Sequence, residues 1–124
     1  MHELSIATAL VETAAEAARA AGATRVLSVR VLVGALSGVE PGALSFCYDA
    51  VVAGTLLEGS TLDIVEEPVV VYCATCARDV TLPGVQSMTC PECGTPSPVM
   101  RGGRELRIES MEVDVDAPEA GTSS

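Results

Sequence analysis

The stretch that decides the fold is residues 73–93, which read CATCARDVTLPGVQSMTCPEC. It holds two Cys-x-x-Cys pairs, Cys73 with Cys76 and Cys90 with Cys93. Two residues between thiolates let the chain turn back, so that both sulfurs of a pair face one ion, and two pairs complete a tetrahedral shell of four thiolates. Because this shell leaves no open position for water, it predicts a structural zinc ion. Zinc would also replace the hydrophobic core that a segment of about 30 residues cannot supply alone.

Two other uses of four cysteines have to be weighed. A disulfide pair or a thioredoxin-like redox site is disfavoured, because a single redox pair needs no second pair beside it. An iron site of the rubredoxin type stays open, since its four-thiolate geometry is the same. The fifth cysteine, Cys47, falls on the apolar face of a predicted helix, and we expect it to be a small buried hydrophobic residue.

Outward from the cysteines, the hydrophobic pattern alternates between helical and strand periods. Helices are predicted at about residues 4–21 and 41–52, with Pro41 opening the second. Strands are predicted at 25–33, about 61–66 and 105–113, and residues 69–72 lead into the first cysteine pair. The third strand loses its alternation at Ser110, which indicates a bulge there.

These elements predict an α+β fold, in which a three-stranded sheet carries two helices and a four-cysteine zinc ribbon is inserted into it. The α+β domain would comprise residues 1–69 and 100–113, and the zinc-ribbon insert residues 70–99. Residues 114–124 are acidic and rich in small side chains, and we expect them to be a disordered tail.

Composition excludes several classes of function. The net charge of −10 over 124 residues argues against a nucleic-acid partner, because phosphate contacts need clustered basic residues. No apolar run approaches the roughly 20 residues of a membrane span, and no basic segment precedes an apolar one at the N-terminus, so a cytoplasmic location is expected. An enzyme is not expected, because the single histidine lies near the N-terminus and the glycine-rich loop at 34–42 lacks the lysine of a phosphate-binding loop.

That histidine, His2, stands beside the α-amine of Met1. Its imidazole, its amide nitrogen and the terminal amine are adjacent chelate donors, and planar nitrogen sets of this kind suit Ni(II) and Cu(II). An exposed terminal histidine is, however, more often an ordinary surface residue. The position alone leaves both interpretations open.

Three motifs together resemble the HypA family of hydrogenase nickel-incorporation proteins, called HybF in some systems. They are Met1-His2-Glu3-Leu4-Ser5-Ile6, the loop from Val33 to Pro41 (VGALSGVEP), and the paired cysteines. The resemblance covers residues 1–113 in order and without large gaps. The first two motifs are specific in combination, whereas paired cysteines occur in many zinc ribbons.

The resemblance implies a nickel metallochaperone that carries Ni(II) as transferable cargo for [NiFe]-hydrogenase maturation. It implies nickel ligation by the Met1 amine, the backbone and imidazole of His2 and the backbone of Glu3, with Glu40 close by. The implied partners are a HypB-type maturation GTPase and the precursor of the hydrogenase large subunit. It leaves a homodimer as an alternative to a monomer. Many members of the family carry a further histidine near a zinc cysteine, which this sequence lacks.

A second function stays open, that of a zinc-ribbon adaptor for protein interactions without nickel delivery. Apart from the family resemblance, Glu3 and Glu40 are acidic residues at predicted helix starts, where a carboxylate is favourable against the helix dipole. Capping a helix and binding a metal do not exclude one another.

Overall fold

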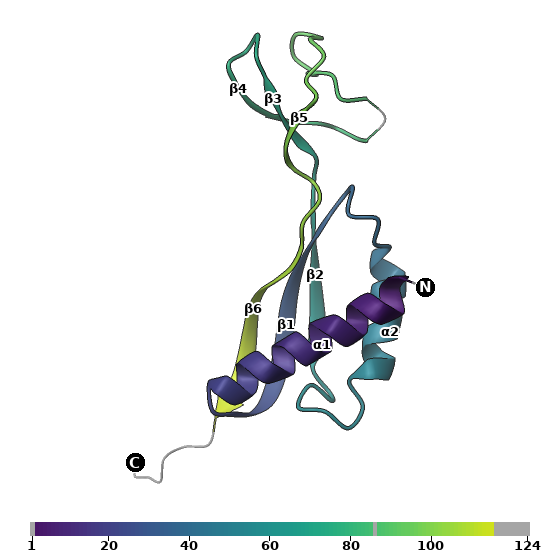
Figure 1. The fold of residues 1–124 in the computed structure, drawn as a ribbon, viewed down its shortest axis with the longest axis vertical. Coiled ribbons are helices and arrows are strands. Elements are labelled where there is room, and N and C mark those ends of the chain that lie inside the picture. The colour runs from purple at the N-terminus through teal and green to yellow at the C-terminus, as the bar shows by residue number, and fades with distance from the viewer. Residues whose placement is uncertain (1, 86, 116–124) are drawn as a thin grey trace. The chain divides into compact units, whose positions relative to one another are not determined.

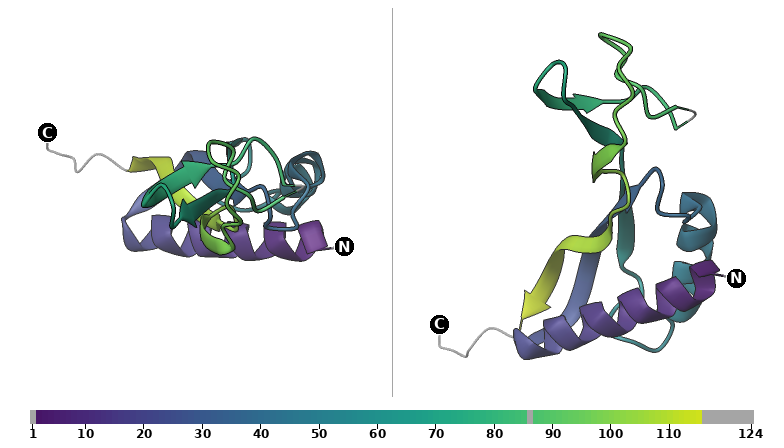
Figure 2. Two further views of the ribbon diagram at one scale, coloured as in Figure 1. Left: turned by 90° about the horizontal axis from the view of Figure 1, so that it is seen from above. Right: turned by 45° about the horizontal axis from the view of Figure 1, so that its top comes forward.

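The computed structural model describes residues 2–85 and 87–115, and for His2 it describes the backbone alone. Two compact units are present (Figures 1 and 2). Unit 1 contains residues 1–31, 40–63 and 108–124, and unit 2 contains residues 32–39 and 64–107. The predicted division into residues 1–69 with 100–113 and an insert at 70–99 is a different partition, and it stays a prediction.

Unit 1 is built from two helices and most of one sheet (Figure 1). Helix α1 spans His2–Ala20 and helix α2 spans Pro41–Val51. The sheet has the order β2-β1-β6, formed by β1 (Ala23–Gly34), β2 (Thr61–Glu67) and β6 (Leu106–Val115). The predicted α+β class, the two helices and the three-stranded sheet are therefore confirmed.

Helix α1 packs against α2 with small side chains on its inner face. Its buried positions recur at helical spacing: Ala7, Val11, Ala14, Ala15 and Ala18. In the views of Figures 1 and 2, the N-terminal end of α1 lies beside α2 and its other end lies near the end of β6. The small residues let the helices approach closely, which brings the starts of α1 and α2 together.

The core of unit 1 holds one aromatic ring. Tyr48 of α2 is 1% exposed, and its hydroxyl lies 2.5 Å from the Ser60 hydroxyl. This hydrogen bond satisfies the polar end of the ring, which a buried tyrosine requires. The neighbouring Cys47, predicted to be buried, is only partly buried and does not belong to this core.

Unit 2 contains a second sheet of three short strands in the order β4-β3-β5. They are β3 (Val70–Cys73), β4 (Arg78–Thr81) and β5 (Val99–Gly102), and both pairings with β3 are antiparallel. The core beneath them combines aliphatic side chains with two of the cysteines: Val69, Val71, Cys73, Val80, Leu82 and Cys90. Two cysteine sulfurs are thus part of the packing of this unit.

The predicted helices and long strands end within about two residues of the observed elements, and the difference at the C-terminal end extends a strand into the predicted tail. Strand β6 continues through Asp114 and Val115, two residues into the predicted disordered tail, and the Thr24 hydroxyl donates to the Asp114 carbonyl at 3.3 Å. The rest of that tail, residues 116–124, lies outside the described residues. Glu109 and Ser110 are both exposed, so the alternation of β6 changes phase where the bulge is predicted.

Candidate metal centre

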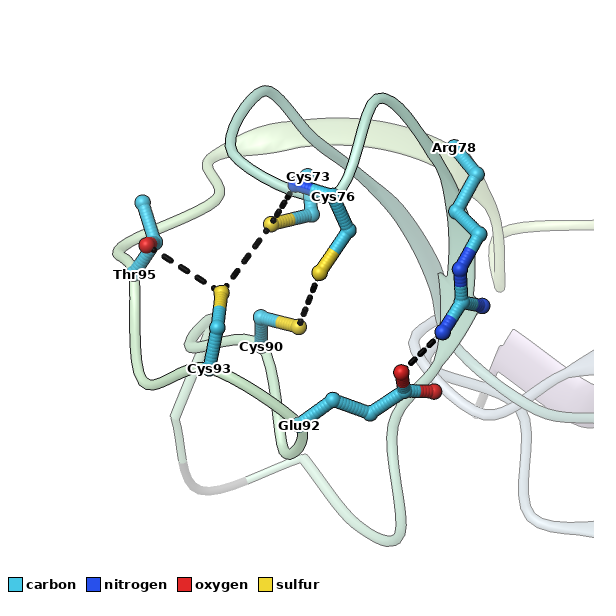
Figure 3. Close-up of polar contacts among 7 residues, drawn as sticks. All are labelled: Cys73, Cys76, Arg78, Cys90, Glu92, Cys93 and Thr95. Atoms are coloured by element: carbon cyan, nitrogen blue, oxygen red, sulfur yellow. Dashed lines mark hydrogen bonds and ion pairs between the residues drawn. The ribbon is translucent and has the colours of Figure 1, made fainter.

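The four predicted ligand cysteines come together in unit 2 (Figure 3). Cys73 ends β3 and Cys76 lies in the turn to β4, while Cys90 and Cys93 lie in the segment before β5. Their sulfur atoms all lie within 4.8 Å of one another, with Cys73 to Cys93 at 3.4 Å and Cys76 to Cys90 at 4.0 Å. Sulfurs bound to one tetrahedral zinc would be about 3.8 Å apart, given a Zn–S bond of about 2.3 Å. The arrangement of the four cysteines therefore fits a metal ion bound by four thiolates.

The same distances exclude disulfide bonds in this arrangement. A disulfide requires a sulfur separation of about 2.05 Å, and the five cysteines are all free. Among the residues that the structure describes, this is also the one cluster of three or more histidine, cysteine or acidic side chains placed to share a metal ion.

A backbone amide closes a turn at each cysteine pair, by a different hydrogen bond in each. The Cys76 amide donates to the Cys73 sulfur at 3.4 Å, and the Gly94 amide donates to the Cys90 carbonyl at 2.9 Å. The residue after each pair has a left-handed backbone, Ala77 with φ 57° and Gly94 with φ 76°. The two pairs thus share the left-handed residue that follows them, although only the second carries the glycine that suits this conformation.

Threonine hydroxyls join the two turns, which the sequence did not predict. The Thr95 hydroxyl donates to the Thr75 hydroxyl at 2.9 Å and lies 3.2 Å from the Cys93 sulfur. The Thr95 carbonyl accepts from the Cys90 amide at 3.0 Å and from the buried Ser97 hydroxyl at 3.0 Å. Thr95 thus contacts a residue of each turn. The sequence feature that could have indicated this role of Thr95 is its position two residues after Cys93.

An ion pair also spans the turns: Arg78 follows the first pair and contacts Glu92, which lies inside the second (Figure 3). Both side chains are about half exposed, at 51% and 53%. Water therefore screens the pair, and its contribution to stability is small. The pair places a positive charge beside sulfurs that would carry negative charge when a metal is bound.

The thiols of the cluster differ in pKa. The pKa of Cys73 is lowered to about 6, mainly because the Cys76 amide donates to its sulfur. The pKa of Cys76 is raised to about 12, mainly because its proton is held in hydrogen bonds with the Cys93 and Cys73 sulfurs. Hydrogen bonds with Thr95 lower the pKa of Cys93. A metal ion must therefore displace a proton from Cys76, whereas Cys73 is already ionised at neutral pH.

The predicted N-terminal residues are placed in part. Met1 and the His2 side chain lie outside the described part of the structure, while the His2 backbone opens α1. Glu3 lies in the first turn of α1, and Glu40 is the N-cap residue of α2. The Glu40 amide donates to Glu3 Oε2 at 3.1 Å, so the structure brings Glu3 and Glu40 together.

Both acidic residues serve the start of α2. The Glu40 carboxylate accepts from the Gly42 amide at 3.1 Å and from the Ala43 amide at 2.7 Å. These amides are among the first N–H groups of α2, which have no partner inside the helix. The hydrogen bond from Glu40 also lowers the pKa of the Glu3 carboxyl. The helix-start interpretation of Glu40 is thus confirmed as a cap.

Comparison with known proteins gives one consistent family. The family model described as "Hydrogenase/urease nickel incorporation, metallochaperone, hypA" matches residues 1–113. A hydrogenase maturation factor HypA from Roseiflexus sp. strain RS-1 is 48% identical over 123 residues, covering 99% of this chain and 100% of that protein. One from Streptomyces avermitilis is 45% identical over 112 residues, covering 90% of this chain and 86% of that protein.

Solved structures agree in fold. The solution structure of the Ni metallochaperone HypA from Helicobacter pylori covers 92% of this chain and 98% of its own, with a TM-score of 0.66 and 23% identity. A second solution structure of a HypA protein covers 94% of this chain, with a TM-score of 0.69 and 24% identity. Within the described residues, no helix combines the length and apolar character that a membrane crossing demands.

Proposed function

This chain belongs to the HypA family of hydrogenase and urease nickel-incorporation metallochaperones, and on that premise we propose that it binds Ni(II) at its N-terminus and delivers it for [NiFe]-hydrogenase maturation. The observation that carries the proposal is the family match from residue 1 to residue 113, which includes the Met1-His2-Glu3 start. The role is binding and delivery, and no catalytic turnover is part of it.

The nickel donors would be the Met1 amine, the amide and imidazole of His2 and the amide of Glu3, with Glu40 close to them. The amides of His2 and Glu3 belong to the first turn of α1, whose N–H groups do not donate to a carbonyl of the helix, and the Glu3 amide contacts the carboxylate of its own side chain. These nitrogens can therefore turn to a metal without breaking a helical hydrogen bond. A planar nitrogen set favours Ni(II) by geometry, since intrinsic affinity ranks copper higher.

Zinc is the ion we assign to the four cysteines. A closed shell of four thiolates makes it a structural ion that holds the turns of unit 2 together. We further propose that the protein acts in the cytoplasm, with a HypB-type GTPase and the hydrogenase large-subunit precursor as partners. The zinc-ribbon adaptor without nickel delivery is the competing function.

The test of nickel binding exploits the composition of the chain. All 7 of its basic residues other than His2 are arginines, so the Met1 α-amine would be the one primary amine, and His2 is the single histidine. Protein beginning with Met1 would be titrated with Ni(II) beside protein with one added residue before Met1 and beside protein whose amine is acetylated, which removes the amine as a donor. We expect one equivalent of planar nickel in the unmodified protein and none in the other two.

The matched variant is His2→Ala, which should lose nickel and keep its zinc content. Equal binding by the unmodified and extended proteins would move the nickel site elsewhere. An absence of nickel binding in all forms would favour the zinc-ribbon adaptor, and loss of zinc from His2→Ala would contradict the separation of the two sites.

A further inference from the structure

Thr95 contacts the cysteine cluster through its side chain, which lies beside Cys93 (Figure 3). Its Oγ1 lies 3.2 Å from the Cys93 sulfur and 2.9 Å from the Thr75 hydroxyl. The Thr95 amide also contacts the Cys93 sulfur. Thr75 lies inside the first cysteine pair, whereas Cys93 closes the second pair. The Thr95 hydroxyl therefore connects a predicted metal ligand of one turn to a residue of the other turn.

Cys93 is the ligand that packing protects least. Cys73 and Cys90 are buried in the core of unit 2, and Cys76 is partly buried. Cys93, in contrast, is exposed, so solvent and competing ligands reach its sulfur most easily. Groups outside the ligand shell hold metal ligands in place, and the loss of one such group commonly lowers metal affinity. Thr95 is placed to give this support to Cys93.

The two threonine hydroxyls can serve Cys93 both with and without its proton. As a thiol, Cys93 donates to the Thr95 hydroxyl, which in turn donates to the Thr75 hydroxyl. A metal-bound thiolate has no proton, and a hydroxyl hydrogen rotates to suit its partner. The Thr95 hydroxyl can then donate to the sulfur while the Thr75 hydroxyl donates to Thr95. This contact is charge-assisted, and it offsets part of the negative charge that four thiolates bring to one divalent ion.

We propose that Thr95 is a positioning residue of the zinc site. Its hydroxyl holds the exposed thiolate of Cys93 in the ligand shell and joins it to the first turn through Thr75, and it does not bind the metal itself. This inference rests on the proposed assignment of zinc to the four cysteines. All the residues involved belong to unit 2, so the role needs no contact between the two units.

The test compares variants of Thr95 in the full chain by competition between the protein and a chelator for zinc. Thr95→Val and Thr95→Ala remove the hydroxyl and keep the backbone amide, whereas Thr95→Ser keeps both. We expect the first two variants to bind zinc roughly tenfold more weakly and Thr95→Ser to stay within about threefold of the wild-type protein. Thr81→Val is the matched control and should leave zinc affinity unchanged. Thr81 is an exposed threonine of the same unit, at the end of β4 that pairs with Val70 and not with Cys73.

Two further measurements separate the support of Cys93 from a general effect on stability. Thr75→Val removes the hydrogen bond between the turns and leaves the Thr95 hydroxyl beside Cys93, so it should weaken zinc binding less than Thr95→Val does. In protein loaded with cadmium in place of zinc, the cadmium NMR signal should shift in Thr95→Val and Thr95→Ala, because one thiolate loses a hydrogen-bond donor. The signal should keep its wild-type position in Thr81→Val.

Wild-type zinc affinity in Thr95→Val and Thr95→Ala would overturn the proposal, and so would an equally large loss in Thr95→Ser. A loss in Thr75→Val equal to that in Thr95→Val would overturn it as well, because the contact with Cys93 would then contribute nothing. An unshifted cadmium signal in the variants without the hydroxyl would have the same meaning. If the wild-type protein bound no zinc, the assignment of the ion would fail and this role with it. If it bound zinc but no nickel, nickel delivery would fail while this role stood, since no part of the role involves nickel.

Discussion

At the scale of single residues, the two acidic residues near the proposed nickel site both accept hydrogen bonds from backbone amides at the start of α2. Glu40 accepts two amides of α2, and Glu3 accepts the amide of Glu40. A carboxylate oxygen can accept more than one interaction, so the cap and a metal contact are compatible at Glu40. The proposed nickel site would thus be built beside a helix start that is ordered before the metal binds.

The residue after each cysteine pair differs, Ala77 after the first and Gly94 after the second, and this difference predicts opposite effects of exchange. Both positions have a left-handed backbone, which costs a residue with a Cβ roughly 1–2 kcal/mol. Gly94→Ala should lower the free energy of unfolding by about 1 kcal/mol, and Ala77→Gly should raise it by about 0.5 kcal/mol after the added entropy of the unfolded chain is subtracted. Denaturant unfolding of the zinc-loaded protein measures both, and a shift in the same direction would contradict the argument. No neighbouring atom lies within 4 Å of a Cβ built at Gly94, so its effect should come from the backbone alone.

At the scale of elements, three segments of unit 2 cross where β1 ends. A Cβ added to Gly34 would lie 2.3 Å from the Gly103 carbonyl carbon, and the Gly34 amide donates to the Glu105 carbonyl at 2.7 Å. Gly103 in turn lies against Val69, where an added Cβ would come within 3.0 Å of the Val69 Cα. The three atoms nearest to the added Gly34 Cβ are all backbone atoms, so no flexible side chain could move away from it.

Gly34→Ala should therefore destabilise the protein by about 2–3 kcal/mol, because the methyl group meets backbone rather than a flexible side chain. Thermal unfolding measures the change. Gly102→Ala is the matched control in the same unit, since its added Cβ would meet the end of the Glu105 side chain at 3.1 Å rather than backbone, and it should cost under about 1 kcal/mol. Equal losses in the two variants would refute the backbone crossing as the cause.

The elements also show what the sequence could predict. Helices α1 and α2 and strands β1, β2 and β6 follow from long hydrophobic periods, and each was placed within about two residues of its observed ends. Strands β4 and β5 were missed because each has four residues, and β4 buries Val80 alone. These strands form because they pair with β3, and their own sequences show no hydrophobic alternation from which a strand could be predicted. The cysteine cluster was predictable because its spacing is local, whereas the contacts of Thr95 and the Arg78–Glu92 pair depend on how two distant turns meet.

At the scale of the whole molecule, the two units should respond differently when zinc is removed. Cys73 and Cys90 are both almost fully buried in the core of unit 2, so a zinc ion there would hold the unit's packing as well as its turns. Unit 1 has its own core around Tyr48 and Leu44 and contains none of the four cysteines. Loss of the metal should therefore loosen unit 2 first.

Lowering the pH should remove zinc, because protons compete with the metal for the cysteine sulfurs, and the cysteine pKa values determine the pH dependence. Zinc needs four thiolates, so it must displace the proton of Cys76, whose pKa is about 12, at every pH in the working range. Cys73 is ionised above pH 6 and protonated below it, because its pKa is lowered to about 6. Zinc affinity should consequently fall with decreasing pH. The fall should be steeper below about pH 6, because zinc binding must then release one more proton. Competition with a chelator at a series of pH values measures the slope, and NMR of the same samples reports each unit. A slope that stays constant through pH 6 would contradict the assigned ionisation of Cys73.

Cys73→Ser tests at neutral pH whether unit 2 can lose its order without unit 1. The variant should lose zinc and the ordered packing of unit 2 while the Tyr48 core of unit 1 persists. Collapse of both units together would show that the zinc ribbon is not an independent part of the fold.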